Sequence, residues 1–439
     1  MRGFVALLIV VAITGCTYVN KPLNDDSVPL ESRKLNQTRA VGRAAQGQIT
    51  NSSDGCFVGL AISGGGLRSA NFGAACMFQL QRMNLLRKVN YISAVSGGAL
   101  PAAYYCLYDD THWNPGNLQR KLTHAFGTDI VLTAVQPWNA AALMFTDWDS
   151  TDVLAASLDG VLFRRGGRSL TFADLRDDRP RLLINATDLQ SGKGFMFCNE
   201  SFDELNSDLG KYPIAHAVAA SSAVPVVLHP KTLRDFSTSF KQYRHFIDGG
   251  VTDNLGVQSL VDVYLAQNGG GPGQAVPYPK GAIIFVIDAG TRYDANLSDK
   301  GDIGFWEKIR RSTDLAATAL IARANSATLG DLILLHAGKS LTAEDLRAKK
   351  QELQEKGFVE IEDQNQRPIQ VIHLSLTNVR RLSNVPFPSF SESIDSISTL
   401  YNIERKEAHL LYQAAELLIR DGAMGEALES VGKKLNVEP

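Results

Sequence analysis

Two apolar segments, each followed by a glycine-rich turn and a helix, place the strongest constraint on how this chain can fold. The first is "CFVGLAI" (56–62), which ends at "SGGG" and leads into apolar residues at helical spacing over 69–86. The second is "YISAV" (91–95), which is followed by Ser96 and a further helical run. Strands that alternate with helices in this way are typical of a parallel α/β sheet.

Other apolar segments predict more strands, of which "AIIFVIDAG" (282–290) is the most strongly apolar. After Asp302 the pattern becomes mainly helical, with a last strand at "IQVIHLSL". We therefore expect a three-layer α/β/α fold with a mainly parallel central sheet and a helical C-terminal extension. The expected boundaries are an α/β domain over 56–300 and a mostly helical part over 301–439 that packs on it. The remaining predicted strands are "RLLINAT" (181–187), "GFMFC" (194–198) and "YRHFIDGG" (243–250).

The N-terminus has the pattern of a secretory signal. Arg2 precedes an uncharged apolar run over 4–13, which is shorter than the roughly 20 residues that span a bilayer. Residues 13–16, "ITGC", resemble the bacterial lipobox, whose cysteine is lipidated. We expect a signal peptide over 1–15 and a lipid on Cys16; the alternative is a plain cleaved signal, or a short anchor, with an incidental cysteine. Thr17, rather than Asp, after the cysteine favours delivery to the outer membrane, facing the periplasm.

The residues after the cysteine, 16–55, are polar with little apolar periodicity, which predicts a flexible tether. The formal net charge of −2 gives no electrostatic reason to expect binding to nucleic acid. The four other cysteines match no zinc pattern, and no metal or other cofactor is expected. Cys76 and Cys106 are expected in the core, whereas a disulfide between Cys56 and Cys198 stays open.

Three turns carry the polar and glycine residues, and each follows a strand that we predict to be parallel. They are "SGGGLR" (63–68), "AVSGG" (94–98) and "DGG" (248–250). Open α/β sheets form their sites at the carboxyl ends of such strands. Glycines let the backbone approach a ligand with unpaired N–H groups, and a serine between small residues suits a sharp strand-to-helix turn. A phosphate-binding loop is not favoured, because no Gly-Lys-Ser/Thr follows and Ser69 stands where GxGxxG needs its last glycine.

Together these motifs resemble those of the patatin-like phospholipases, a family related in fold to the cytosolic phospholipases of animals. The family's Gly-Gly-Gly-x-Arg/Lys loop, Gly-x-Ser-x-Gly elbow and Asp-Gly-Gly/Ala turn correspond to "GGGLR", "AVSGG" and "DGG". Further similarity lies in "PRLLINATDLQSGKGFMF" and "AVAASSAVPVV", so the resemblance covers about 57–290. Ala94 replaces the first elbow glycine and Ser69 the glycine that closes the loop, which favours a bacterial lipoprotein or cytosolic-phospholipase branch. Ser69 is expected to cap the following helix.

The resemblance implies a catalytic dyad in which Ser96 is the nucleophile and Asp248 acts directly as its base. A partly desolvated site is expected to raise the pKa of this aspartate from about 3.9. Arg68 is expected either to contact a lipid phosphate or to fix the loop through a salt bridge. The expected oxyanion hole consists of backbone N–H groups, from Gly64, Gly65, Gly66 and Gly97.

A Ser–His–Asp triad is the main alternative for the chemistry. Asp288 ends the strand 282–288, and His336 and His373 follow it in the order found in α/β-hydrolases. Both histidines lie in apolar segments, where a core role is more common, so we favour the dyad. Three more histidines flank the Asp248 turn without a recognisable motif, and two residues after it, Asp253 and Asn254, are expected to be caps; the histidines are His216, His229 and His245.

The predicted function is hydrolysis of fatty-acyl esters in membrane phospholipids or lysophospholipids by a lipid-anchored enzyme. A tether to a bilayer raises the local concentration of a substrate in the same bilayer. One alternative is an esterase or thioesterase that acts on another acyl substrate. The other is a catalytically silent lipoprotein that binds lipid or serves as a scaffold.

Overall fold

The computed structural model describes residues 20–26, 55–134, 136–139, 146, 148–225, 227–238, 240–268, 276–290, 343–363, 365–398 and 401–437. The expected signal peptide and Cys16 lie outside these residues, and so does His336. No helix within the described ranges has both the length and the apolar character to cross a bilayer.

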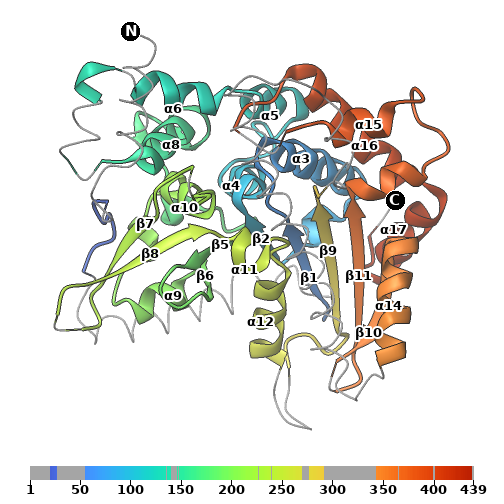
Figure 1. Ribbon diagram of the computed structural model, residues 1–439. Helices are drawn as coiled ribbons and strands as arrows, with labels where there is room; N and C mark the ends of the chain where they lie inside the picture. Colours follow the sequence, from blue (N-terminus) through green and yellow to red (C-terminus); the bar gives the residue numbers. More distant parts are fainter. Residues whose placement is uncertain are drawn as a thin grey trace.

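The described part of the chain forms a nine-stranded sheet in the order β10-β11-β9-β1-β2-β5-β8-β7, with β6 paired to β5 (Figure 1). Its centre is parallel and consists of β11 (Pro368–Ser375), β9 (Ala282–Asp288), β1 (Phe57–Ile62), β2 (Tyr91–Val95) and β5 (Arg181–Asp188). The other strands pair antiparallel: β10 (Phe358–Glu362), β6 (Gly194–Phe197), β8 (Gln242–Asp248) and β7 (Lys231–Asp235). This mostly parallel sheet confirms the predicted fold class.

Helices cover both faces of the sheet, because successive residues of a buried strand point to opposite sides. In β1, Leu60 and Ile62 belong to one apolar core, which includes residues of α3 (Gly66–Arg82), α4 (Ala99–Leu107) and α16 (Arg405–Arg420). Phe57 and Ala61 belong to the core on the other face, against α12 (Val257–Asn268). The fold therefore has three layers.

The remaining elements surround these layers. The helices are α5 (Pro115–Leu122), α6 (Phe126–Ala134), α8 (Ser150–Leu158), α9 (Asn199–Glu204), α10 (Ile214–Ser221), α11 (Gly250–Asp253), α14 (Ala343–Lys356), α15 (Phe390–Asp395) and α17 (Gly422–Lys434). Two short strands, β3 (Arg164–Arg165) and β4 (Arg168–Ser169), form a separate ribbon. The short 3-10 and π turns are η2 (Leu86–Lys88), η3 (Ser96–Gly98), η4 (Asp159–Phe163), η5 (Phe172–Asp174), η6 (Leu209–Lys211) and η8 (Leu376–Arg381).

The strand that carries Asp248 differs from the prediction, because β8 runs antiparallel to β5. The last residues of β5 extend beyond the end of β2, and β8 pairs with this extension, with Ala186 opposite Asp248. Since Val95 lies opposite Asn185, the next residue of β5 brings Asp248 to the level of Ser96. The antiparallel strand β8 therefore places Asp248 at the edge where the parallel strands end, next to the Ser96 turn.

Part of the segment expected to be a flexible tether is fixed to the edge strand β7. The side-chain oxygen of Asn20 accepts the Thr232 N–H at 2.7 Å. Asn24 accepts the Arg234 N–H at 2.9 Å and donates to the Arg234 carbonyl at 2.8 Å. These amide side chains satisfy backbone groups that an edge strand otherwise leaves unpaired. Residues 20–26 therefore belong to the folded body.

Candidate active site

Ser96 lies in a strained turn directly after β2. Its φ is +50°, a left-handed value that is uncommon for a residue other than glycine and costs about 1–3 kcal/mol. The Ser96 N–H donates to Ser221 Oγ at 2.8 Å, and that hydroxyl donates to the Asn185 carbonyl at 2.5 Å. The backbone strain is thus held by a buried hydrogen-bond chain, and the Ser96 side chain is only 6% exposed.

Gly97 allows the turn to pack directly against the glycine loop after β1. A Cβ atom on Gly97 would lie 1.9 Å from the Gly66 carbonyl oxygen, and one on Gly98 would lie 2.6 Å from the Ser63 carbonyl oxygen. Any larger residue at Gly97 would displace one of the two turns. The sequence "GGG" and the sequence "SGG" are therefore needed together.

The glycine loop adopts conformations that suit glycine. Gly65 has φ +131° and Gly66 has φ +56°. Gly66 begins α3, where the first N–H groups have no acceptor inside the helix, so its N–H is available to a ligand. The Gly64 N–H is used differently, since it donates to the Asn254 carbonyl at 2.9 Å. Ser69 does not cap α3, because it lies within the helix and its hydroxyl donates to the Ser63 carbonyl.

Asp248 ends β8 and is 7% exposed. Its Oδ1 accepts the Gly250 N–H at 2.7 Å, and its own N–H donates to the Ala223 carbonyl at 2.9 Å. Burial raises the pKa of Asp248 to about 6, although hydrogen bonds from Gly250 N–H and from the Ser96 side chain act to lower it. The site therefore pairs a serine hydroxyl with a carboxylate that is more basic than an ordinary aspartate.

Arg68 lies beneath the glycine loop and is 3% exposed. Its guanidinium donates to the Ile397 carbonyl at 2.9 Å. Its charge also helps to lower the pKa of Asp288 and acts in the same direction on Asp395. This position favours the loop-fixing role over contact with a lipid phosphate.

Among the described histidines that the sequence offers for a triad, three contact side chains other than Ser96 and Asp248. His373 Nε2 lies 3.2 Å from Asp288 Oδ2, and β1 separates the strand of Asp288 from that of Ser96. His229 contacts Ser150, and His245 contacts Thr232. The fourth described candidate lies near an aspartate: His216 Nδ1 is 3.7 Å from Asp152 Oδ1.

Asp253 acts as the predicted cap, at the start of α12. Its carboxylate accepts N–H groups from Leu255, Gly256 and Gln258 at 2.7–3.1 Å. A further residue of the site, Ser221, was not singled out in the sequence. The available signal was the run of small residues in "AVAASSAVP", which permits close packing against the Ser96 turn and the Asp248 turn.

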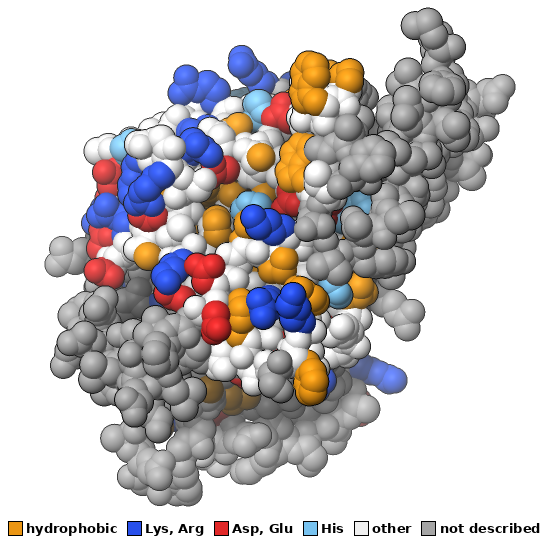
Figure 2. Space-filling model, turned by 90° about the vertical axis from the view of Figure 1, so that its left-hand side faces the viewer, with side chains coloured by type: hydrophobic (Ala, Val, Ile, Leu, Met, Phe, Trp, Pro, Cys, Tyr) orange, Lys and Arg blue, Asp and Glu red, His pale blue; other side chains and the backbone are white. Residues whose placement is uncertain are grey.

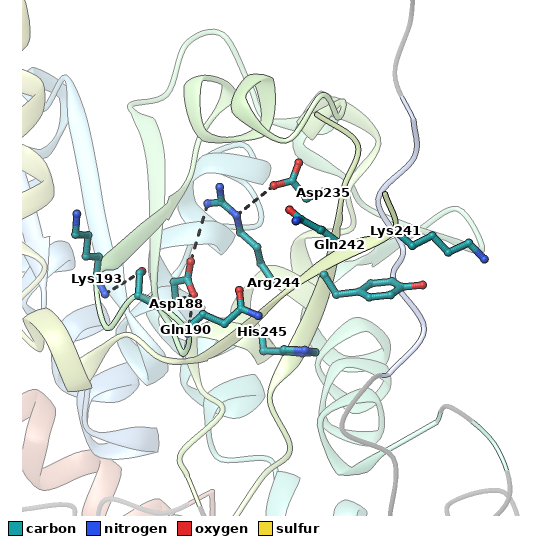
Figure 3. A pocket seen from close by; sticks show the side chains of 10 residues that line it. Asp188, Gln190, Lys193, Asp235, Lys241, Gln242, Arg244 and His245 are labelled. Atoms are coloured by element: carbon teal, nitrogen blue, oxygen red, sulfur yellow. Dashed lines mark hydrogen bonds and ion pairs between the residues drawn. The ribbon is translucent and has the colours of Figure 1, made fainter. Parts of the chain in front are cut away.

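A small cavity of about 10 Å³ lies at the site, between Gly66, Gly97 and apolar side chains of α6 and α8. A much larger one, about 780 Å³, opens between the β5–β6 and β7–β8 turns (Figure 3). In it Arg244 lies between Asp188 and Asp235, at 4.0 Å and 3.5 Å. The larger cavity is polar and contains neither Ser96 nor Asp248, so its size does not make it the reaction centre.

Comparisons with known proteins agree with this architecture. Human GIVD cytosolic phospholipase A2 superposes with a TM-score of 0.52 at 12% identity, over 95% of this chain and 66% of that enzyme. The same human enzyme in complex with methyl gamma-linolenyl fluorophosphonate gives a TM-score of 0.47 at 13% identity, over 96% and 66% of the two chains. At 12% identity the likeness to the first of these structures shows the fold alone, and this chain spans 66% of the length of that enzyme.

The sequence itself matches no curated protein in the comparison. It does match the family model described as Patatin-like phospholipase, over residues 60–261. This range contains the glycine loop, the Ser96 turn and the Asp248 turn. The chain therefore carries a domain of the patatin-like phospholipase family.

Proposed function

We propose that the protein is a serine acyl hydrolase that cleaves fatty-acyl esters of phospholipids or lysophospholipids. The family supports lipid acyl hydrolysis in general, and the detail rests on one observation. Ser96, held at φ +50°, lies level with Asp248 at the edge of the sheet, close enough for its side chain to act on the pKa of that buried aspartate, which burial raises to about 6. A nucleophile and a base within hydrogen-bonding reach are what covalent catalysis requires.

In the proposed reaction Asp248 takes the proton of Ser96 as Oγ attacks the ester carbonyl carbon. The resulting oxyanion accepts hydrogen bonds from the N–H groups of Gly65, Gly66 and Gly97. Collapse breaks the ester C–O bond, and the proton passes from Asp248 to the departing alkoxide. Water then attacks the acyl-enzyme with Asp248 again as base, which releases the fatty acid and restores Ser96. Gly64 is left out of the donor set because its N–H already binds Asn254.

We further propose that Cys16 carries lipid and holds the enzyme at the periplasmic face of a bacterial outer membrane. The support is the "ITGC" sequence after a short apolar run. A single acyl chain gives only marginal anchoring, so the several chains of a lipoprotein would be needed for stable attachment. A Cys16→Ser variant is expected to leave the membrane fraction; retention in the same amount would contradict lipidation.

Labelling with a fluorophosphonate serine probe tests the dyad. Ser96→Ala should abolish labelling, and Asp248→Asn should slow it by about 10²–10⁴-fold, the usual contribution of a general base. Ser191→Ala and Asp177→Asn change exposed residues of the same types and serve as controls. Labelling of Ser96→Ala and Asp248→Asn at the wild-type rate would refute the dyad. A wild type that neither reacts with the probe nor hydrolyses an ester would favour a silent lipoprotein.

A further inference from the structure

The cavity beside Ser96 is closed to an acyl chain. Its volume of about 10 Å³ is close to the least that holds one water, whereas ligand pockets usually measure about 300–1,000 Å³. Its lining is nevertheless apolar, with Phe126 from α6 and Leu154 and Leu158 from α8. A wall must therefore move before a fatty chain can lie there.

Some of the walls cannot move without disturbing the catalytic groups. Gly66 and Gly97 pack backbone to backbone in the proposed oxyanion hole. Ser222, another wall, lies between Ser221, which binds the Ser96 N–H, and Ala223, which binds the Asp248 N–H. A wall that moves to admit an acyl chain must therefore come from another part of the cavity lining.

Tyr401 is a wall from the C-terminal part, outside the matched range 60–261. Its hydroxyl donates to the Ser222 carbonyl at 2.6 Å. Its own carbonyl accepts the Gly127 N–H at 3.2 Å, directly after Phe126. Burial, and then the charge of Asp248, raise the pKa of Tyr401, which places the phenol close to the proposed base. One residue thus joins the start of α6 to the turn that holds both catalytic groups.

We propose that Tyr401 is a specificity-determining residue, whose ring closes the acyl pocket and is displaced by a long acyl chain. This inference rests on the proposed acyl hydrolase function. Displacement must break the hydrogen bond to Ser222, so that bond sets part of the cost of admitting a long chain. Short acyl groups need less of the cavity and are less affected.

The test is the ratio of kcat/KM for p-nitrophenyl palmitate to that for p-nitrophenyl acetate. Tyr401→Phe keeps the ring but loses the hydrogen bond, and should raise this ratio by about twofold to tenfold. Tyr401→Ala also removes the ring, and should raise it further. Thermal melting of both variants checks that they fold, and Tyr401→Phe carries the test if Tyr401→Ala does not.

Tyr412→Phe is the matched control, because this tyrosine of the same C-terminal part packs near Phe78 with ring centroids 6.5 Å apart and should leave the ratio unchanged. An unchanged or lower ratio in Tyr401→Phe would overturn the inference. That result differs from failure of the proposed function, in which the wild type itself neither hydrolyses the acetate ester nor binds the fluorophosphonate at Ser96.

Discussion

Asp248 determines how the proposed activity depends on pH. As a base it must be deprotonated, and its pKa is raised by burial to about 6. We therefore expect kcat/KM for a soluble ester to fall as the pH decreases through about 6. An ordinary exposed aspartate would place this fall near 4. Measurement of kcat/KM across the acid range checks this, and full activity at pH 4.5 would contradict it.

The same carboxylate is expected to reduce the stability of the folded protein at neutral pH. Because the pKa of Asp248 is higher in the folded state, the folded state binds more protons between about pH 4 and 6. The free energy of unfolding therefore falls as the pH rises through this window, by up to about 3 kcal/mol when the pKa of the carboxyl is raised from 3.8 to about 6.

Asp248→Asn removes this titration and keeps an oxygen for the Gly250 N–H. We expect its melting temperature to exceed that of the wild type at pH 8, and the difference to vanish near pH 4. Asp177→Asn, at an exposed site, should show no such pattern. A less stable Asp248→Asn protein at pH 8 would mean that the carboxylate is better satisfied than its burial indicates.

Residue types in the sequence were sufficient to select Ser96, Asp248 and the glycines as candidates, because each follows an apolar strand in a recognisable turn. They were insufficient for Ser221, since its role depends on a contact with the Ser96 N–H across 125 residues of chain. For Arg68 they left open either a contact with a lipid phosphate or a loop-fixing role. The hydrogen bond from its guanidinium to the Ile397 carbonyl, which the sequence could not show, favours the second.

Among the elements, the Ser96 turn and the glycine loop after β1 depend on each other through Gly97. Gly97→Ala would place a Cβ 1.9 Å from the Gly66 carbonyl oxygen, so the loop must shift. We expect fluorophosphonate labelling to slow by about 10²–10³-fold, as on loss of an oxyanion donor. Overpacking should also lower stability by about 1–3 kcal/mol.

Gly116→Ala provides the control for this substitution, because no atom lies within 4 Å of its added Cβ. It lies in α5, where alanine favours the helix more than glycine does. Labelling rates of both variants, with thermal melting, separate a local effect from a general one. Wild-type labelling in Gly97→Ala would show that the contact between the turns is dispensable.

At this scale the sequence predicted the parallel centre of the sheet well, since β1, β2 and β9 are continuous apolar runs. It could not show that β8 is antiparallel, because alternation within "YRHFID" is the same in either direction. Direction depends on which neighbour a strand joins, and β8 joins the overhang of β5. The sequence correctly predicted that a strand ends at Asp248, but the prediction that this strand is parallel was wrong.

For the whole molecule, the fixed segment 20–26 has a measurable consequence if Cys16 is lipidated. Cys16 and Asn20 are four residues apart, so at most about 14 Å of chain joins the lipid to the body. β7 and β10 lie at opposite edges of the sheet, seven strand spacings or about 34 Å apart. The β7 edge should therefore lie nearer to the membrane than the β10 edge.

Energy transfer to an acceptor dye in the vesicle surface tests this arrangement. A donor at Lys241→Cys, beside β7, should transfer more strongly than one at Glu362→Cys on β10. The cysteines at 56, 76, 106 and 198 are buried thiols that form no disulfide in the described part of the chain, so they should compete little for the label. Equal transfer from the two sites in vesicle-bound protein would contradict the short connection, and a Cys16→Ser protein provides the unbound control.

The side of the molecule that contains α6, β7 and β8 carries scattered orange and blue side chains rather than one uniform patch (Figure 2). Among its exposed apolar residues are Leu132 of α6 and Phe240 of the β7–β8 turn. If Cys16 carries the proposed lipid, four residues before Asn20, we expect a surface of this mixed kind to rest on the bilayer without inserting deeply.

If Cys16 is lipidated, the pairing of Asn20 and Asn24 with β7 also limits where the proposed enzyme can act. A folded domain on a long flexible linker could reach a neighbouring membrane or a soluble target. With only four residues between the lipid and Asn20, this domain could only change its orientation close to the membrane. The enzyme would then act only on its own bilayer, and its lipid substrate would reach it by lateral diffusion. The two amide side chains that bind the edge strand β7 would thus set how far from its lipid anchor the enzyme can reach.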